Sequence, residues 1–380
     1  MKKLLLVLFA VLLVSVLIFA GCTSAPAPAA PPSATPVVTP TTQATPTEKP
    51  IVWEFYTPSM ALNPSGPTGT LGSPMMSIKD EIPLATKGRL QIKILTGGEH
   101  PYKAPDFIKL MKDLHPPMME FGFAQVAGTD ARLSVADLPM LFPPDQDVFY
   151  EIADKKLMPE YFDPILLNDY GYQPLITISW TPQRIGGKDF FVNSWDSLKG
   201  KKIRTWNAQL VDWVTMMGGS PVSVPLGDVY TSLQTGLLDG IISSSGGLMD
   251  NAWGEVCKNL TVIEVQMGLI SFMVSKEALD SLPVDVRNDF LAWAKGAQPR
   301  ARAAYQANVA MQTMAGVAKL GIKIERTPPD FWNEARAQCD QAVWKQFIKR
   351  SGGAGSPANE ALNQTVEILE SMGYKVPYTP

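Results

Sequence analysis

The spacing of apolar and polar residues predicts strands and helices in alternation along most of the chain. Apolar and polar positions alternate in two short segments, as in half-buried strands, and two mostly apolar runs indicate further strands. The expected strands are residues 51–56, 90–95, 119–126 and 175–180, and the last of them leads into residues 185–192, where Gly186-Gly187 suits a turn. Helical periodicity marks residues 104–114 between them. Such alternation favours an α/β architecture.

One helix is expected to be much longer than the others. It follows Ser281 and Pro283 and ends before Gly321, which are the residue types that begin and close helices. At about 1.5 Å per residue it would extend on the order of 50 Å, which is longer than one small domain. We expect it to lie across two domains, with a kink at Pro299.

The N-terminus has the pattern of an export signal. Lys2 and Lys3 precede an almost unbroken apolar run from residue 4 to residue 20. The following Phe19-Ala20-Gly21-Cys22 resembles the lipobox of bacterial lipoproteins, although Phe19 departs from the usual Leu. Residues 1–22 are therefore predicted to be a signal that ends at a lipidated Cys22. The alternative, an uncleaved N-terminal helix, would leave the protein on the same side of the membrane.

Residues 23–50 are rich in Pro, Thr and Ala and contain no aromatic residue. Such a segment cannot bury enough apolar surface to offset its chain entropy, so we expect a disordered tether. The tether leaves 330 of the 380 residues for the folded part, and this length favours two domains.

Composition narrows the functional classes. A formal net charge of −3 provides no basic surface for nucleic acid. Cys257 and Cys339 form a disulfide or remain as buried thiols, and neither belongs to a metal-binding spacing. The two histidines, His100 and His115, have no recognisable nucleophile partner, and no G-x-S-x-G motif is present. We expect neither an enzyme nor a metal or other cofactor.

An ordered set of motifs in the middle of the chain carries the most information. The segments are Ser197-Leu-Lys-Gly-Lys-Lys-Ile-Arg-Thr-Trp206, Met217-Gly-Gly-Ser-Pro-Val222, Asp228-Val-Tyr230 and Ser232-Leu-Gln-Thr-Gly-Leu-Leu-Asp-Gly240. In this order they resemble the substrate-binding proteins of tripartite ATP-independent periplasmic (TRAP) transporters, the DctP family. The resemblance implies a periplasmic-binding-protein-like fold of two lobes, with hinge strands and a long helix that spans both lobes. Residues 51–181 with 269–308 would form lobe I, and residues 182–268 with 309–380 would form lobe II.

The resemblance also implies the binding residues. Arg204 occupies the position whose guanidinium grips the substrate carboxylate, and Arg184 stands where a second arginine often assists. A guanidinium suits this task because its rigid fork of donors matches both oxygens of a carboxylate. An alternative for each arginine is an exposed surface cation. The other matching positions are Asn207, Leu226, Gln125 and Ser243, and Trp206 and Tyr56 are candidate walls of the cleft.

Two departures from the family pattern bear on the ligand. Ser243 stands where an Asn is expected, and Trp206 stands where smaller residues are frequent. Together Trp206, Leu226 and Met249 favour an acid with an apolar or aromatic body, although each has an equal alternative as a core residue.

The resemblance implies an extracytoplasmic, lipid-anchored receptor that delivers a small organic acid to the small and large TRAP membrane subunits. We expect this receptor to be a monomer.

The alternatives are a receptor for an ABC importer or a tripartite tricarboxylate system, a chemosensory receptor, and, less favoured, a secreted hydrolase.

Overall fold

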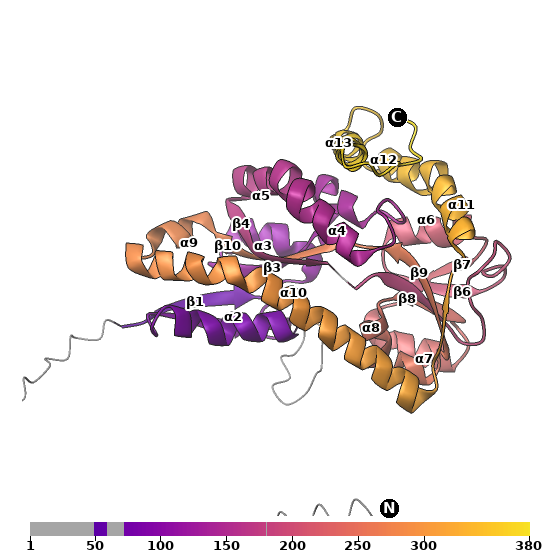
Figure 1. The fold of residues 1–380 in the computed structure, drawn as a ribbon, viewed down its shortest axis with the longest axis horizontal. Coiled ribbons are helices and arrows are strands. Elements are labelled where there is room, and N and C mark those ends of the chain that lie inside the picture. Colours follow the sequence, from indigo (N-terminus) through magenta and orange to yellow (C-terminus); the bar gives the residue numbers. More distant parts are fainter. Residues whose placement is uncertain (1–48, 59–71, 180) are drawn as a thin grey trace, which may run out of the picture. The chain divides into compact units, whose positions relative to one another are not determined.

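The computed structural model describes residues 49–58, 72–179 and 181–380. The predicted export signal, Cys22 and most of the tether lie outside these residues. Among the described helices, none is both long enough and apolar enough to cross a membrane. The described chain contains two β-sheets with helices packed around them (Figure 1), which confirms the α/β architecture expected from the sequence.

The first sheet has five strands in the order β2-β1-β3-β10-β4. Strand β1 runs parallel to β2 and β3, whereas β10 runs antiparallel to β3 and β4. Every residue of β3 and β10 is buried, as expected for central strands covered on both faces. The strands are β1 (Ile51–Tyr56), β2 (Leu90–Leu95), β3 (Met118–Gly122), β4 (Tyr172–Ser179) and β10 (Leu269–Ser275).

The second sheet has six strands in the order β11-β9-β5-β8-β6-β7. The chain passes from the first sheet to the second between β4 and β5, and it returns between β9 and β10. These two crossings are the positions at which hinge strands are expected. The strands are β5 (Gln183–Gly187), β6 (Lys202–Thr205), β7 (Ser220–Ser223), β8 (Gly240–Ser243), β9 (Asn259–Gln266) and β11 (Lys323–Arg326).

Helices surround both sheets. The α-helices are α2 (Gly72–Ala85), α3 (Phe107–Leu114), α4 (Gln146–Ile152), α5 (Asp163–Tyr170), α6 (Ala208–Met216), α7 (Val229–Gln234), α8 (Ser245–Asp250), α9 (Lys276–Ser281), α10 (Val284–Leu320), α11 (Pro329–Cys339), α12 (Lys345–Arg350) and α13 (Pro357–Ser371). Short 3₁₀ segments are η1 (Ala104–Asp106), η2 (Phe123–Val126), η3 (Ala131–Asp137), η5 (Leu226–Asp228) and η6 (Trp253–Glu255). Two π-helical segments, η4 (Ala153–Phe162) and η7 (Asp340–Trp344), interrupt the α-helical stretches.

The long helix predicted from the sequence is confirmed as α10, which has 37 residues and continues through Pro299. Gly321 closes it in the left-handed conformation, with φ of 67°. Its first part packs on α2 and β4, and its last part packs on α8 and η6. The helix therefore lies against elements of both sheets (Figure 1).

One predicted strand has different bounds in the structure, and one predicted turn follows directly after a strand. The strand expected over 119–126 ends at Gly122 and continues as η2, because a short apolar run does not distinguish a buried strand from a buried helical turn. In the segment 185–192, where a turn was expected at Gly186-Gly187, strand β5 ends at Gly187. The chain turns there so tightly that a Cβ atom on Gly187 would lie 2.4 Å from the carbonyl oxygen of Phe190.

The C-terminal helices connect the two halves of the described chain. Segment η7 packs on α6, which follows a strand of the second sheet, whereas α13 packs on η3 and η4, which lie between strands of the first sheet. The lobe boundaries given above stay a prediction. Cys257 and Cys339 are both buried free thiols.

Candidate functional site

Arg204 is a buried cation at the end of a central strand. It lies in β6, where its register partners are Ile241 of β8 and Val222 of β7. Only 7% of the residue is exposed, and its Nε donates a hydrogen bond of 3.4 Å to the carbonyl oxygen of Val224. The guanidinium carbon lies 6.0 Å from the centre of the Trp253 ring, which is within the range of a cation–π contact.

No carboxylate pairs with Arg204 in the part of the chain that the structure describes. Burial disfavours the charged form and lowers the pKa of Arg204 to about 10, so the side chain is still a cation at neutral pH. A buried charge without a partner is costly, and an anion beside it removes much of that cost. The position therefore has the electrostatics of an anion-binding site.

Arg184, in contrast, already has an acidic partner. Its Nη2 lies 2.8 Å from Oε1 of Glu264, and its Nη1 donates a 2.8 Å hydrogen bond to Ser245. Glu264 is 6% exposed and has a φ of 51°, in the left-handed region that is unfavourable for residues other than glycine. The β5–β9 register shifts at the same place. A buried ion pair thus stands where the chain passes between the sheets.

Strand register relates the two arginines. Arg184 is paired with Ser243, and Arg204 with Ile241, on opposite sides of β8. Because positions 241 and 243 are two apart, their side chains lie on the same face of the sheet. Arg184, Ser243 and Arg204 therefore share one face of the sheet.

Arg184 and Glu264 also line a hollow of about 620 Å³ between α10, the start of α4 and the β4–β5 crossing. Tyr305 of α10 contributes to it, together with Pro182. The hollow contains none of the other predicted binding residues.

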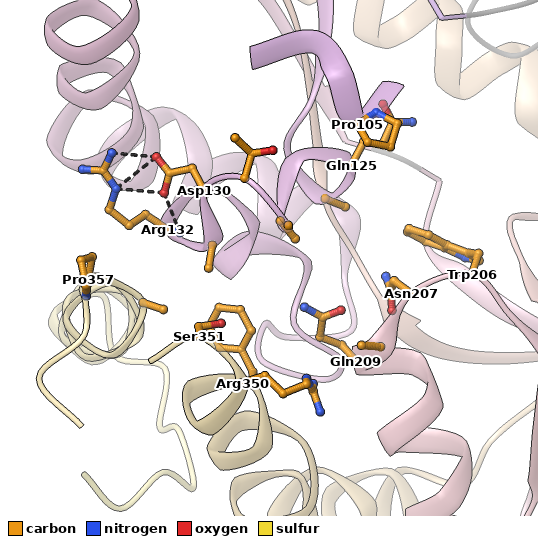
Figure 2. Close-up of a pocket in the computed structure, with 18 of the residues that line it drawn as sticks. Pro105, Gln125, Asp130, Arg132, Trp206, Asn207, Gln209, Arg350, Ser351 and Pro357 are labelled. Atoms are coloured by element: carbon orange, nitrogen blue, oxygen red, sulfur yellow. Dashed lines mark hydrogen bonds and ion pairs between the residues drawn. The ribbon is translucent and has the colours of Figure 1, made fainter. Parts of the chain in front are cut away.

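A larger groove, of about 1040 Å³, brings three predicted residues together. Gln125 comes from η2, and Trp206 and Asn207 come from the turn between β6 and α6. Figure 2 shows these residues around the hollow, with α12 and α13 on the opposite side. Arg204 itself is not among the residues that line the groove, but it precedes Trp206 by only two positions.

Asn207 is also the N-cap residue of α6. Its Oδ1 accepts a 2.8 Å hydrogen bond from the backbone N–H of Leu210 and so caps α6. Capping uses the oxygen of the amide only, and the Nδ2 donors remain on the side of the groove. The local sequence therefore fixes the start of α6 at the place where a ligand contact is expected.

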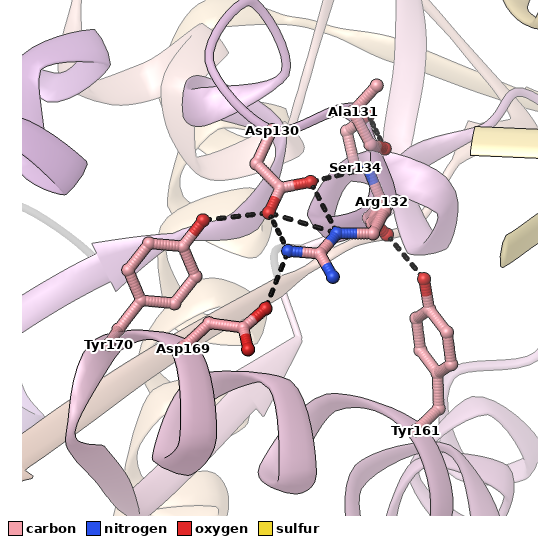
Figure 3. A network of polar contacts seen from close by, with 7 residues as sticks. All are labelled: Asp130, Ala131, Arg132, Ser134, Tyr161, Asp169 and Tyr170. Atoms are coloured by element: carbon pink, nitrogen blue, oxygen red, sulfur yellow. Dashed lines mark hydrogen bonds and ion pairs between the residues drawn. The ribbon is translucent and has the colours of Figure 1, made fainter. Parts of the chain in front are cut away.

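The far wall of the groove is a closed polar network (Figure 3). Arg132 donates to both oxygens of Asp130 and also contacts Asp169 at 2.8 Å. Tyr170 donates a 2.7 Å hydrogen bond to Asp130. Although burial raises the pKa of Asp130, the hydrogen bonds from Arg132 and Tyr170 outweigh it and hold this pKa below its usual value.

The remaining predicted residues are placed as follows. Tyr56 ends β1, donates a 3.1 Å hydrogen bond to Glu54, and lies 5.3 Å from the ring of His100. Ser243 is half-buried at the end of β8. The segment η5 begins at Leu226, whose side chain lies outside the described part, as does the whole of Cys22. Within the described residues, no group of three or more His, Cys, Asp or Glu is arranged to hold a metal ion.

Three residues that matter at the site were not predicted from the sequence. Glu264 and Trp253 lie far along the chain from the arginines that they contact, and nothing in their local sequence indicates these pairings. Gln209 lines the groove and is only 8% exposed. Its position two residues after the predicted binding residue Asn207, in the first turn of a helix, was the available signal.

Comparisons with known proteins agree on one family. The model of the bacterial extracellular solute-binding proteins, family 7 (DctP), matches residues 68–350. A solute-binding protein of Chromohalobacter salexigens is 23% identical over 285 residues, which are 73% of this chain and 81% of that protein. The ectoine-binding periplasmic protein TeaA of Halomonas elongata is 34% identical over 131 residues, which are 33% of this chain and 36% of that protein.

Solved structures show the same two-lobed fold. A TRAP periplasmic solute-binding protein of Chromohalobacter salexigens, solved with bound D-glucuronate, superposes on this chain with a TM-score of 0.70 at 21% sequence identity. The match covers 84% of this chain and 99% of the solved chain. An extracytoplasmic solute receptor of Bordetella pertussis that binds pyroglutamic acid has a TM-score of 0.66 at 20% identity, and covers 83% of this chain and 99% of its own.

Proposed function

The chain belongs to the DctP family of bacterial extracellular solute-binding proteins, and from this membership we propose that it is a TRAP receptor whose solute is a small organic acid held by Arg204. The acid is bound reversibly and without chemical change. The observation that carries the proposal is the burial of the Arg204 guanidinium without a carboxylate partner among the described residues. A carboxylate meets this requirement through two parallel charge-assisted hydrogen bonds.

Other residues have supporting parts in this proposal. Asn207 and Gln125 offer amides, and Trp206 offers an aromatic face, along the groove beside Arg204. Ser243 and Arg184 share the sheet face of Arg204, and Arg184 is held in place by Glu264. Tyr56 and Leu226 remain predicted members of the cleft.

Binding is coupled to closure of the two lobes. The ligand favours the closed form by the difference between its affinities for the closed and open forms. The closed receptor then docks on the small and large membrane subunits and releases the acid. The relatives that bind glucuronate and pyroglutamic acid support an acidic solute, because both compounds carry a carboxylate.

A thermal-shift screen tests this function. The purified chain is heated with dicarboxylates, 2-oxo acids, aromatic acids and sugar acids, and in parallel with neutral sugars and amides. We expect a rise in the melting temperature with one class of acid only, since a ligand that binds the folded state stabilises it. Stabilisation by neutral compounds and by none of the acids would contradict the proposal.

The lipid anchor is a separate part of the proposal and rests on the lipobox-like Phe19-Ala20-Gly21-Cys22. Cys22→Ser removes the thiol that would carry the lipid. We expect the wild-type chain to sediment with membranes and the variant to be released or to remain unprocessed, with no incorporated palmitate. Equal palmitate labelling of both proteins would exclude an anchor at Cys22.

A further inference from the structure

The second half of helix α10 exposes an apolar face to solvent. Between residues 303 and 318, Met311 is 61% exposed, Met314 is 72% exposed and Val317 is 38% exposed. The other positions of this stretch that are described as exposed are all alanines, and together they complete the apolar face of α10: residues 303, 304, 307, 310, 315 and 318. The solvent side of a surface helix usually carries charged and polar residues. A face of this composition indicates a partner that covers it.

The opposite side of the same stretch packs inside the molecule. Tyr305 and Val309 are buried, and Gly316 lies so close to Met249 that a Cβ atom on the glycine would clash with the methionine sulfur. The last part of α10 contacts α8 and η6 on this side (Figure 1). The apolar face includes positions 304, 307, 311, 314 and 318, and this alternation of three and four residues is the one at which two helices pack together. Its alanines let two helix backbones approach closely, so the face fits a second helix.

The size and composition of the face favour a weak protein interface. An α-helix over residues 303–318 extends about 24 Å and is about 10–12 Å wide with its side chains, so the face covers on the order of 400 Å². Two such faces would bury on the order of 800 Å², which is in the range of weak and transient interfaces. A lipid bilayer is a less suitable partner. Helices that lie on membranes present Trp, Phe or Leu to the lipid, whereas this face has only Ala, Met and Val.

Two charged side chains flank one edge of the apolar face. Asp147 accepts a 3.4 Å hydrogen bond from Gln306, and Arg326 lines the same hollow as Met314. Asp147 and Arg326 are both exposed, and neither forms an ion pair with another described residue. This edge therefore carries a negative charge near the beginning of the face and a positive charge near its end.

These charges favour one orientation of two copies of the chain. In an antiparallel pair with a twofold axis at residues 310–311, the beginning of the face on one copy lies opposite its end on the other. Asp147 of each copy then lies near Arg326 of the other, so that opposite charges meet. A parallel pair would instead bring Arg326 near Lys319, which lies on the other edge of the face, and like charges would meet.

We propose that two copies of this chain associate through the apolar face of α10, antiparallel about a twofold axis, with Asp147 of each copy beside Arg326 of the other. Both copies bury the same uncharged surface, so no like charges meet at the centre of the interface. This weak dimer replaces the monomer expected from the sequence. The inference goes beyond the proposed function and does not depend on it, because Arg204 lies outside the face.

Disulfide cross-linking in intact cells that express the full chain tests the interface. Met311→Cys places a thiol beside the twofold axis, where two copies can form a disulfide. Lys349→Cys places a thiol at an exposed position of α12 and is the matched control. The native Cys257 and Cys339 are buried. After mild oxidation we expect at least tenfold more disulfide-linked dimer with Met311→Cys than with Lys349→Cys.

A second pair of cysteines tests the orientation of the two copies. In the antiparallel pair, residue 304 of one copy lies near residue 318 of the other. Cells that express Ala304→Cys and Ala318→Cys on differently tagged chains should give the mixed cross-linked dimer, whereas Ala304→Cys expressed alone should give none. Cross-linking of Ala304→Cys to its own copy would overturn the antiparallel orientation.

Further substitutions in the Met311→Cys chain test the individual contacts. Ala307→Glu introduces a carboxylate from each copy into the interface and should lower the cross-linked fraction at least fivefold. Ala292→Glu, at an exposed alanine of α10 before the face, is the control and should leave this fraction unchanged. Asp147→Arg and Arg326→Asp should each lower the cross-linked fraction, and the two together should restore it, because the opposite charges meet again.

The outcomes separate a second copy from other partners. Equal cross-linking of Met311→Cys and Lys349→Cys would overturn the inference, and so would a cross-link from Met311→Cys to other proteins only. If Ala307→Glu releases the protein from anionic vesicles but leaves the cross-linked fraction unchanged, the face binds lipid and the inference is wrong. No solute enters these measurements, so their failure and the failure of the proposed function are distinguishable.

Discussion

At the scale of single residues, the cost of burying Arg204 links stability to binding. On folding, the side chain loses most of its contact with water. It forms one long hydrogen bond to Val224 and a cation–π contact with the ring of Trp253. Neither partner carries a negative charge. The ligand-free protein therefore holds a cation that an anion would stabilise, and we expect removal of the charge to raise stability and to weaken binding.

Arg204→Met should raise the free energy of unfolding of the ligand-free protein by about 1–3 kcal/mol, because it removes a buried and unpaired charge. The pKa of Arg204 is about 10 in the folded protein, below its ordinary value, so the unfolded chain binds more protons only above that pH. The cost of the charge is therefore fully present below pH 10 and falls as the pH rises above it. Urea denaturation should give the same difference at every pH from 5 to 9, and a variant destabilised over this range would contradict it.

Arg184→Met should act in the opposite direction. It leaves Glu264 buried and unpaired in a left-handed backbone conformation, which should lower the free energy of unfolding by roughly 3 kcal/mol. Adding Glu264→Gln should restore part of this loss. Lys201→Met, which breaks an exposed pair with Asp189, is the control and should cost less than about 1 kcal/mol. An equal effect of Arg184→Met and Lys201→Met in urea denaturation would show that the buried pair has no special role.

At the scale of elements, the turn between β6 and α6 positions the side chains that line the groove. The start of α6 is fixed by Asn207 as its N-cap, two residues after β6 ends. The same turn provides Trp206 and Gln209 to the groove. One short turn thus connects the strand that holds Arg204 to the groove.

Two substitutions separate the capping and binding roles of Asn207. Asn207→Ala should lower the free energy of unfolding by about 1 kcal/mol, whereas Asn207→Asp keeps the cap oxygen and should be close to neutral. Both should weaken acid binding, since both remove Nδ2 and the Asp adds a negative charge. Ser275→Ala, which removes the cap of α9, should lower stability without an effect on binding. Calorimetric binding curves for Asn207→Asp that match the wild type would remove Asn207 from the site.

The sequence predicted elements well where local residues determine them. The helix α10 was predicted because a Pro and a Gly bound it, whereas the strand over 119–126 was predicted four residues too long because its apolar run continues into η2. A binding role for Arg204 was expected from the resemblance of its motif. The pairing of Arg184 with Glu264 was not, because it joins residues 80 positions apart, and pairings of this kind depend on the tertiary fold.

At the scale of the whole molecule, the fold places two sheets under one long helix, with two crossings of the chain between the sheets. The order of motifs was enough to predict this architecture. The ligand class was not predictable in the same way, because Gln125, Asn207 and Gln209 meet only in the folded chain.

Ligand-dependent closure is the prediction at this scale. With saturating acid, small-angle X-ray scattering should give a smaller radius of gyration for the wild-type protein, since the ligand favours the closed form. The Arg204→Met variant should show no change at the same acid concentration. An identical radius of gyration for the wild-type protein with and without bound acid would argue against closure.

Calorimetric titration of Arg204→Met is the most direct test of carboxylate binding. The wild-type protein and the variant are each titrated with the preferred acid and with the corresponding neutral amide. We predict that the wild type binds the acid at least tenfold more tightly than the amide, as expected for a charged pair of roughly 1.5–3 kcal/mol, and that the variant loses this preference. If the variant binds the acid as tightly as the wild type does, Arg204 is not the carboxylate anchor and the account is wrong.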